Sequence, residues 1–104
     1  MIRQFDVCAN PVALGREERP YLVAIQHNRL SDLSTRILVP LVVRKVLPEE
    51  SRLSPTVVIH GRSYFIDPTN IVTLPLRRLG QAVANLEADR DRIIAAIDLV
   101  FTGV

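Results

Sequence analysis

The positions of proline constrain the fold of this chain more than any other feature of its sequence. All seven prolines lie between Pro11 and Pro75, and none follows in the rest of the 104 residues. Proline interrupts a helix interior and cannot donate a hydrogen bond inside a central strand. The part up to Pro75 is therefore predicted to form short elements, whereas the part after it is free to form one long helix.

Short runs rich in β-branched residues lie between the prolines, as is typical of strands. Six runs are predicted as strands: residues 2–9, 21–27, 35–43, 56–61, 63–67 and 70–76. Gly61 lies where the fourth and fifth runs would join in a tight hairpin, because glycine accepts turn conformations that other residues resist. Pro40 falls inside the third run and requires an edge or a bulge there. The pattern predicts a small barrel or sandwich.

After Gly80 the sequence changes to a helical pattern, since residues 81–101 contain neither proline nor glycine. Apolar residues recur there at helical spacing: Leu79, Val83, Leu86, Ile93, Ile94, Ile97, Val100 and Phe101. Asn85 is the predicted N-cap, and the carboxylates that follow it suit the positive end of a helix. The prediction is a mainly β fold with one C-terminal α-helix, in a single domain over residues 1–104.

The charge and cysteine content argue against several classes of function. A formal net charge of +2 is too weak to predict nucleic-acid binding. Cys8 is the only cysteine, so no internal disulfide can form, and its alternating neighbours predict strand packing. We find no signal peptide and no apolar span approaching about 18 residues. The expectation is a cytoplasmic protein that contacts neither a membrane nor nucleic acid directly.

Few residues are placed to carry catalysis or to bind a cofactor. His27 and His60 lie in different runs, with no cysteine or carboxylate at metal-ligand spacing nearby. Four scattered glycines cannot form a phosphate-binding loop. Glu87, Asp89 and Asp91 are interpreted as a solvated acidic face rather than a cation site. No catalytic residue, metal or cofactor is therefore predicted.

Two features of the predicted helix call for a specific explanation. Arg90 lies between Leu86 and Ile93 on the apolar stripe, where a charge needs a rim position or a partner. Residues 99–104 are mostly apolar. They would either dock back onto the protein's own barrel or form a hydrophobic tip or dimer interface.

Together these pieces resemble the CcdB family of bacterial toxins over nearly the whole chain. The likeness opens with "RQFDVCANP", continues through "RPYLVAIQ" and "RILVPLV", and includes "PTVVIHG" and "NIVTLPL". Gln26, Arg36, Pro40 and Leu41 match positions of the family's second and third strands. The segment after Gly80 then follows the family's closing helix almost in step.

The resemblance implies a homodimer with an SH3-like barrel and a C-terminal helix, the fold shared by CcdB-like and MazF-like toxins. It also implies a toxin that is not an enzyme, which binds the A subunit of DNA gyrase, a topoisomerase, and traps the cleavage complex. A CcdA-like antitoxin with a disordered arm would neutralise it. Antitoxin arms of this kind are typically acidic, so three basic residues are predicted to bind the arm because of their charge: Arg62, Arg77 and Arg78.

The gyrase-contact positions of the family carry over residue by residue. Thr102, Gly103 and Val104 match its final Trp-Gly-Ile. The remaining matched positions are Phe101, Asp98, Arg90, Arg29 and Leu30. Thr102 stands where the family has its tryptophan, and Arg90 reverses the charge of a helix acid. These departures leave three interpretations open: a co-varied target surface, a different target, or lost toxicity.

Two alternatives remain open beside the gyrase toxin. The stretch "RPYLVAIQHN" also resembles MazF/PemK endoribonucleases, in which an arginine matching Arg19 helps to cleave RNA. That family uses a threonine on the next strand, where this chain has Val42 and Val43. Without a positioned partner, Arg19 lacks the required acid–base geometry. The second alternative is a non-toxic homologue that only binds an antitoxin.

Overall fold

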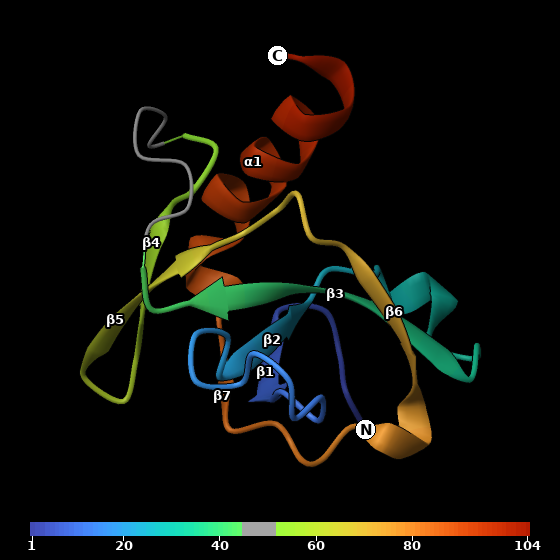
Figure 1. The fold of residues 1–104 in the computed structure, drawn as a ribbon. Coiled ribbons are helices and arrows are strands. Elements are labelled where there is room, and N and C mark those ends of the chain that lie inside the picture. The colour runs from blue at the N-terminus through green and yellow to red at the C-terminus, as the bar shows by residue number, and fades with distance from the viewer. Residues whose placement is uncertain (45–51) are drawn as a thin grey trace.

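The computed structural model describes residues 1–44 and 52–104 (Figure 1). The described residues form seven strands: β1 (Asp6–Ala9), β2 (Tyr21–Ala24), β3 (Thr35–Val42), β4 (Thr56–Ile59), β5 (Arg62–Ile66), β6 (Val72–Pro75) and β7 (Ala84–Asn85). Three short 3-10 turns connect or follow them: η1 (Asn28–Leu30), η2 (Leu76–Arg78) and η3 (Glu87–Asp89). One helix, α1 (Arg90–Thr102), completes the chain. The prediction of a mainly β fold with one C-terminal helix is confirmed.

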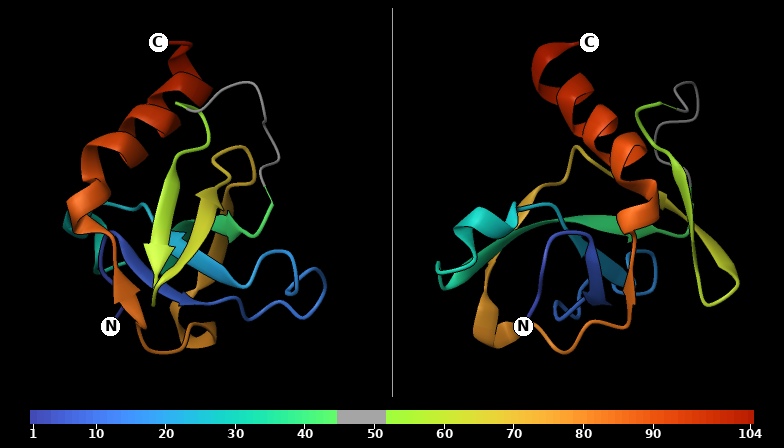
Figure 2. Two further views of the ribbon diagram at one scale, coloured as in Figure 1. Left: turned by 90° about the vertical axis from the view of Figure 1, so that its left-hand side faces the viewer. Right: turned by 180° about the vertical axis from the view of Figure 1, so that it is seen from behind.

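The strands form one antiparallel sheet that curves into a nearly closed barrel (Figures 1 and 2). The order is β4-β5-β3-β2-β1-β7, with β6 also paired to β3. β3 is the longest strand and pairs with β2 along one edge. Along its other edge β3 pairs first with β6 and then with β5. It therefore joins the β4–β5 hairpin and β6 on one side to β2, β1 and β7 on the other.

Pro40 lies at the point where β3 changes partner. Leu38 is the last residue paired with β6, and Leu41 is the first paired with β5. The carbonyl of Pro40 accepts a 3.0 Å hydrogen bond from the Asp67 amide on this same edge. The N–H and C=O groups of one strand residue point to the same edge of the strand. The N–H that Pro40 lacks would therefore point to the gap between β6 and β5, where no strand partner needs it. The sheet thus tolerates a proline in a strand that is central over most of its length.

The β4–β5 hairpin has the predicted tight turn. His60 and Gly61 occupy its two central positions with φ angles of 50° and 81°. Two successive positive φ angles define the mirror-image turn that matches the twist of paired strands. The prediction that Gly61 supplies this turn is confirmed.

Alternation along the strands buries both faces of the sheet. Val7, Val23 and Leu41 point into the barrel core, together with Ile93 of α1. Their neighbours point the other way, because successive strand side chains alternate between faces. These form a second cluster: Ile2, Cys8, Leu22, Ala24 and Leu38. The prediction that Cys8 packs within a strand is confirmed.

The predicted helix over residues 81–101 is wrong at its start. Val83 and Leu86 lie beside β1, donating to the carbonyls of Val7 (2.7 Å) and Phe5 (2.8 Å). The amides of Val83 and Leu86 therefore pair with the N-terminal segment around β1, with which β7 forms a ladder, and cannot bond within a helix. As a result, α1 begins only at Arg90. Sheet pairing prevails over the local helical pattern because it satisfies these amides in the packed barrel.

The predicted capping also differs. Asn85 does not cap α1; its Oδ1 accepts from the Glu87 amide at 2.8 Å and so starts η3. Glu87 and Asp89 belong to η3, which leaves Asp91 as the acidic residue in the first turn of α1. The first and second predicted strands are also shorter than expected, because β1 starts at Asp6 and β2 ends at Ala24.

Candidate functional site

The C-terminal end of α1 projects away from the barrel (Figure 2). The Phe101 side chain is 68% exposed and Val104 is 86% exposed. By contrast, Ile93 and Ala96 nearer the helix start are fully buried. The alternative in which this segment docks back onto its own barrel is therefore wrong for residues 101–104, whereas Leu99 and Val100 are half-buried. The helix tip, defined as residues 98–104, is an exposed and largely apolar projection.

Local hydrogen bonds hold the helix tip in shape. Gly103 adopts a left-handed conformation with φ of 77°, and its amide donates to the Leu99 carbonyl at 3.0 Å. The Thr102 hydroxyl donates to the Asp98 carbonyl at 2.7 Å. Because this bond uses the one proton of the hydroxyl, Thr102 offers a partner its methyl group and an acceptor oxygen. Phe101 and Val104 carry the exposed apolar surface beside it.

Arg90 lies at the opposite end of α1. Thirteen helical residues span about 20 Å, so Arg90 is remote from the helix tip. Its guanidinium lies 5.4 Å from the centroid of the buried Phe5 ring, and Nη1 lies 4.0 Å from Glu87 Oε1. Its side chain is 46% exposed. Of the two predicted alternatives, a rim position or a partner, Arg90 has both: it is half-exposed, and its partners are an aromatic face and a carboxylate.

A polar groove of about 460 Å³ surrounds the Arg90 head. It is lined by Arg3, Gln4, His27, Asn28, Asn85, Glu87 and Arg90. The groove therefore lies between the start of α1 and η1, the turn that carries Arg29 and the half-exposed Leu30. Of the eight residues assigned to gyrase by resemblance, Arg90 lines this groove, and Arg29 and Leu30 follow its lining residue Asn28 in η1. The other five form the helix tip, which lies apart from η1 (Figure 2).

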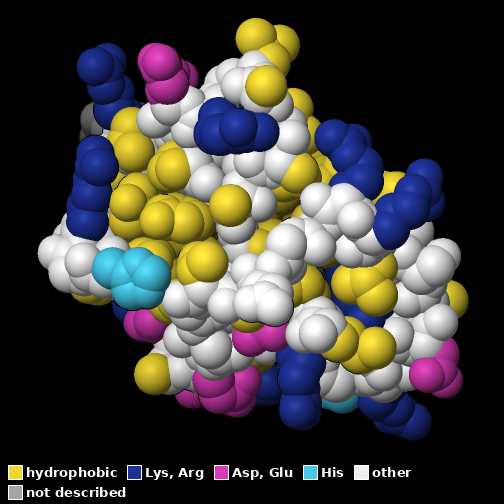
Figure 3. Space-filling model, turned by 90° about the horizontal axis from the view of Figure 1, so that it is seen from below, with side chains coloured by type: hydrophobic (Ala, Val, Ile, Leu, Met, Phe, Trp, Pro, Cys, Tyr) yellow, Lys and Arg dark blue, Asp and Glu magenta, His cyan; other side chains and the backbone are white. Residues whose placement is uncertain are grey.

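The three basic residues assigned to antitoxin binding do not share one surface of the protomer. Arg62 lies in the β4–β5 hairpin, where its guanidinium is 5.6 Å from the Tyr64 ring centroid. Arg77 and Arg78 are exposed in η2, which follows β6 at the other end of the molecule from that hairpin (Figure 1). On the face seen in Figure 3, lysine and arginine side chains are spread around hydrophobic areas rather than gathered in one patch.

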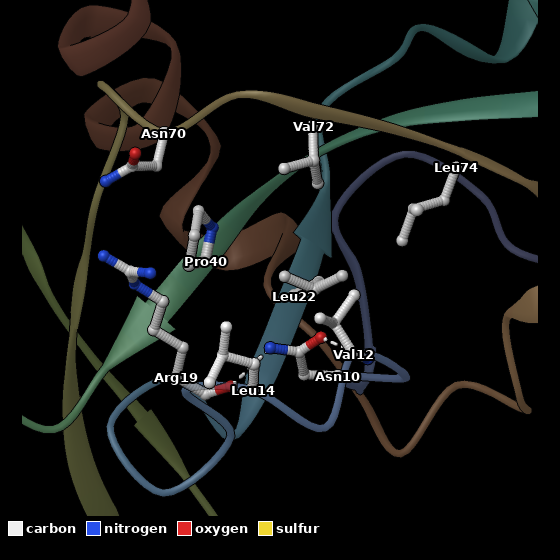
Figure 4. Close-up of a pocket in the computed structure, with 9 residues that line it drawn as sticks. All are labelled: Asn10, Val12, Leu14, Arg19, Leu22, Pro40, Asn70, Val72 and Leu74. Carbon is white, nitrogen blue, oxygen red and sulfur yellow. Dashed lines mark hydrogen bonds between the residues drawn. The ribbon is translucent and has the colours of Figure 1, made fainter.

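Arg19 lines a separate, smaller pocket of about 160 Å³ between the 10–19 loop and the sheet. The lining residues are Asn10, Val12, Leu14, Arg19, Leu22, Pro40, Asn70, Val72 and Leu74 (Figure 4). Among these nine, Arg19 is the one ionisable residue. Cleavage of RNA needs a general base, which must be a proton-accepting group within hydrogen-bond reach of the substrate. Arg19 cannot serve, because a guanidinium stays protonated. The lining offers no histidine, carboxylate or hydroxyl for that role.

The two histidines make local structural contacts. His27 Nδ1 accepts from the Arg29 amide at 3.0 Å and so caps η1. His60 Nε2 lies 3.1 Å from the Val83 carbonyl, which links the β4–β5 turn to the segment entering β7. Across residues 1–44 and 52–104, no three His, Cys, Asp or Glu side chains gather to hold a metal ion. No described helix is long and apolar enough to span a bilayer.

The carboxylates near the helix start have basic neighbours. Asp89 Oδ1 accepts from Arg92 Nη1 at 2.7 Å, and Glu87 lies near Arg90. Arg92 Nη2 also donates to the Thr56 carbonyl at 2.6 Å. Arg92 therefore connects α1 to the edge of β4, a contact that the periodicity of the sequence did not indicate.

Cys8 is unsuited to nucleophilic chemistry in this position. The residue is fully buried in the second cluster. Burial, assisted by the nearby negative charge of Asp6, raises the pKa of its thiol to about 11. The reactive thiolate is therefore scarce near neutral pH.

The described residues thus form a compact β-barrel domain with an exposed apolar helix tip and a polar groove. The chain belongs to the CcdB family, because the family model described as CcdB protein matches residues 4–103. At the family level it is the toxin of a toxin–antitoxin pair, in a family that poisons gyrase rather than catalysing a reaction. A search of curated protein sequences returned no match.

Proposed function

We propose that this protein binds the A subunit of DNA gyrase through the helix tip of α1 and traps the cleavage complex. The observation that carries this proposal is the exposure of Phe101 (68%) and Val104 (86%) on a helix that projects from the barrel. An isolated protomer gains nothing from leaving an aromatic side chain in water, whereas a partner that covers it gains binding free energy. On this proposal the protein is a binding toxin and not an enzyme.

The groove around Arg90 supplies the second half of the proposed gyrase contact. In η1, which contributes Asn28 to the groove, the 49% exposed Leu30 offers an apolar contact, while Arg29 and Arg90 offer positive charge. A target surface that fits this groove would carry a carboxylate, because the charge of Arg90 is opposite to that of the acid usual in the family. We therefore favour the co-varied target surface among the three interpretations.

The proposal includes a homodimer and an antitoxin. The apolar helix tip would lie at the dimer interface as well as near gyrase, in a single-domain protein of residues 1–104 that works in the cytoplasm. A CcdA-like antitoxin would neutralise it through an acidic arm. Since Arg62 lies far from Arg77 and Arg78, such an arm would have to wrap around the protomer to reach all three.

The gyrase proposal is tested by mixing purified protein with bacterial gyrase and supercoiled plasmid, and measuring linear DNA after denaturation. We expect the unmodified protein to produce linear DNA and Phe101→Ala to reduce the yield at least about tenfold. Val58→Ala is the matched control, because Val58 is similarly exposed (59%) but lies on β4. Equal loss in both variants would contradict a contact through the helix tip.

A tryptophan variant tests the departure at Thr102. Thr102→Trp restores a large anchor, which we expect to strengthen the gyrase contact by about 2 kcal/mol. Linear DNA from this variant alone would mean that toxicity was lost with the aromatic ring. If neither protein produces linear DNA, the gyrase proposal is wrong and the non-toxic, antitoxin-binding alternative gains support.

The endoribonuclease alternative is tested with total RNA. Because the pocket around Arg19 lacks a proton acceptor, we expect no RNA cleavage. Cleavage that disappears in Arg19→Ala but persists in Arg16→Ala, from the same loop, would replace the gyrase proposal with the endoribonuclease alternative.

A further inference from the structure

We propose that the pocket beside Arg19 docks a short acidic peptide segment of a partner protein. One aliphatic side chain of the segment fills the pocket, and a neighbouring carboxylate pairs with Arg19. The inference rests on the proposed toxin–antitoxin pairing only in one respect: the acidic arm of an antitoxin is a natural source of such a segment. The preference for an acidic peptide ligand depends only on the residues that line the pocket.

The size of the pocket selects a single side chain. Its volume is about 160 Å³. An engineered protein cavity of about 150 Å³ holds one benzene molecule, whereas pockets for whole small-molecule ligands usually exceed about 300 Å³. The space therefore suits one leucine- or isoleucine-sized group and is too small for a nucleotide.

Apolar side chains dominate one end of the pocket, where Asn10 is the polar exception, and two polar head groups lie at the other end (Figure 4). Val72 and Leu74 of β6, Leu22 of β2 and Val12 of the loop lie towards one end. The head groups of Arg19 and Asn70 lie towards the other. A ligand that fits both ends has an aliphatic group and an acceptor of hydrogen bonds within a few ångströms of each other.

Arg19 is the feature that specifies negative charge. The residue is exposed, and among the described residues its guanidinium has no hydrogen-bond or ion-pair partner. The nearby Glu17 and Glu18 line a different hollow, formed by residues 13–18 on the loop itself. The pocket therefore presents a cation without a lining anion, which favours a carboxylate ligand.

The loop that carries Arg19 is already ordered around the pocket. The buried Asn10 side chain donates from Nδ2 to the Arg19 carbonyl at 2.8 Å and accepts from the Val12 amide at 2.9 Å. The Arg19 amide donates to the Gly15 carbonyl at 2.8 Å, where Gly15 has a φ of 80°. This preformed rim lowers the entropic cost of binding.

The apolar surface beyond the pocket argues for a peptide rather than a free metabolite. Leu14 at the loop is 90% exposed and Val12 is 40% exposed. A small aliphatic acid would fill the pocket but leave both side chains in water. A peptide continues past the pocket and covers them.

Nuclear magnetic resonance titration of the isotopically labelled protein tests the proposal. The probe is the capped peptide acetyl-Glu-Asp-Leu-Asp-Glu-amide, and 4-methylpentanoate represents a free aliphatic acid. We expect saturable shifts at millimolar peptide in the 10–19 loop and in β6. Replacing the leucine of the probe by alanine should weaken binding at least about tenfold, and replacing its acids by amides should weaken binding about fivefold.

Two protein variants locate the charge contact. Arg19→Gln should weaken peptide binding about fivefold, whereas Arg16→Gln, which removes an equal charge from the same loop outside the pocket lining, should change it less than about twofold. An unaltered overall spectrum checks that both variants are folded. Absence of saturable shifts, an unchanged affinity in Arg19→Gln, or equal binding of 4-methylpentanoate would each overturn the proposal. Since the titration contains neither gyrase nor antitoxin, its outcome is independent of the cleavage assay.

Discussion

The Nε atom of Arg36 donates a 2.9 Å hydrogen bond to the carbonyl oxygen of Ile2, joining β3 to the start of the chain. Arg36 is only 2% exposed. Its other donors reach three further carbonyl oxygens, those of Ser31, Leu33 and Thr35. A buried cation is thus solvated by backbone dipoles, and it organises the loop that leads from η1 into β3.

Loss of this guanidinium should destabilise the protein strongly. We expect Arg36→Met to lower the free energy of unfolding by about 3 kcal/mol, because it leaves buried carbonyls unpaired. Arg36→Lys keeps the charge but not the planar set of donors, and we expect a loss of about 2 kcal/mol. Urea denaturation measures both. The exposed Arg77→Met should change the value by less than about 0.5 kcal/mol, and an equal loss there would contradict the assigned role of Arg36.

The β4–β5 turn provides a matched pair of glycine substitutions. Gly61 has a φ of 81°, and a Cβ at this position would meet no atom within 4 Å, so Gly61→Ala introduces backbone strain without a clash. We expect a loss of about 1 kcal/mol. Gly80 has no positive φ and equal space, so Gly80→Ala should be neutral or stabilising by about 0.5 kcal/mol. Thermal unfolding compares the two, and similar effects would contradict the strain argument.

The attachment of α1 to β4 depends on Arg92. Arg92→Met removes both the 2.6 Å bond to the Thr56 carbonyl and the ion pair with Asp89, and we expect a loss of about 1 kcal/mol. Asp89→Asn removes only the charge of the partner and should cost less than about 0.5 kcal/mol. If the two variants lose equal stability in urea, the ion pair rather than the β4 contact accounts for the effect.

Cys8 should make stability fall at alkaline pH. The pKa of its thiol is raised from 9.0 to about 11 in the folded protein, so the unfolded chain releases the proton first. The stabilising contribution is complete below pH 9 and is lost as the pH rises from 9 towards 11. Denaturation between about pH 8 and about pH 10.5 should therefore show a steeper decline for the unmodified protein than for Cys8→Ala. Parallel curves would contradict the raised pKa.

The proposed dimer makes a prediction for Phe101. Phe101→Asp places a charge on the exposed apolar helix tip, and we expect at least about a tenfold rise in the dimer dissociation constant. Analytical ultracentrifugation over a concentration series measures it. Val58→Asp introduces the same charge at a similarly exposed site on β4 and should leave the constant unchanged. An unchanged constant in Phe101→Asp would place the dimer interface elsewhere.

Local features of the sequence predicted most of the strands correctly. Prolines and glycines mark the ends of the runs, and β-branched residues fill them, so each strand carries its own local signal. The turn at Gly61 was predictable for the same reason, since glycine is favoured wherever φ is positive. Partner choice was not predictable, because Pro40 indicates only a missing donor and not the two strands that meet there.

The candidate sites were predictable to different degrees. The apolar residues of the helix tip were visible in sequence, but their exposure was not, since the same pattern suits a docked helix. Arg90 could be placed at a rim, yet its contact with Phe5 joins residues 85 positions apart. The pocket beside Arg19 gave no sequence signal, because its lining comes from the 10–19 loop, β2, β3, β6 and the residue Asn70 before β6.

The sequence by itself determined the first six strands, the C-terminal helix and their order, because turn and strand preferences act over a few neighbouring residues. Tertiary structure alone decided where α1 begins, since the amides of Val83 and Leu86 bond to the carbonyls of Val7 and Phe5 rather than to a preceding helical turn. It also decided which apolar residues stay exposed and which distant side chains share a pocket. Those outcomes depend on contacts between segments that are remote in sequence, and such contacts exist only in the closed barrel.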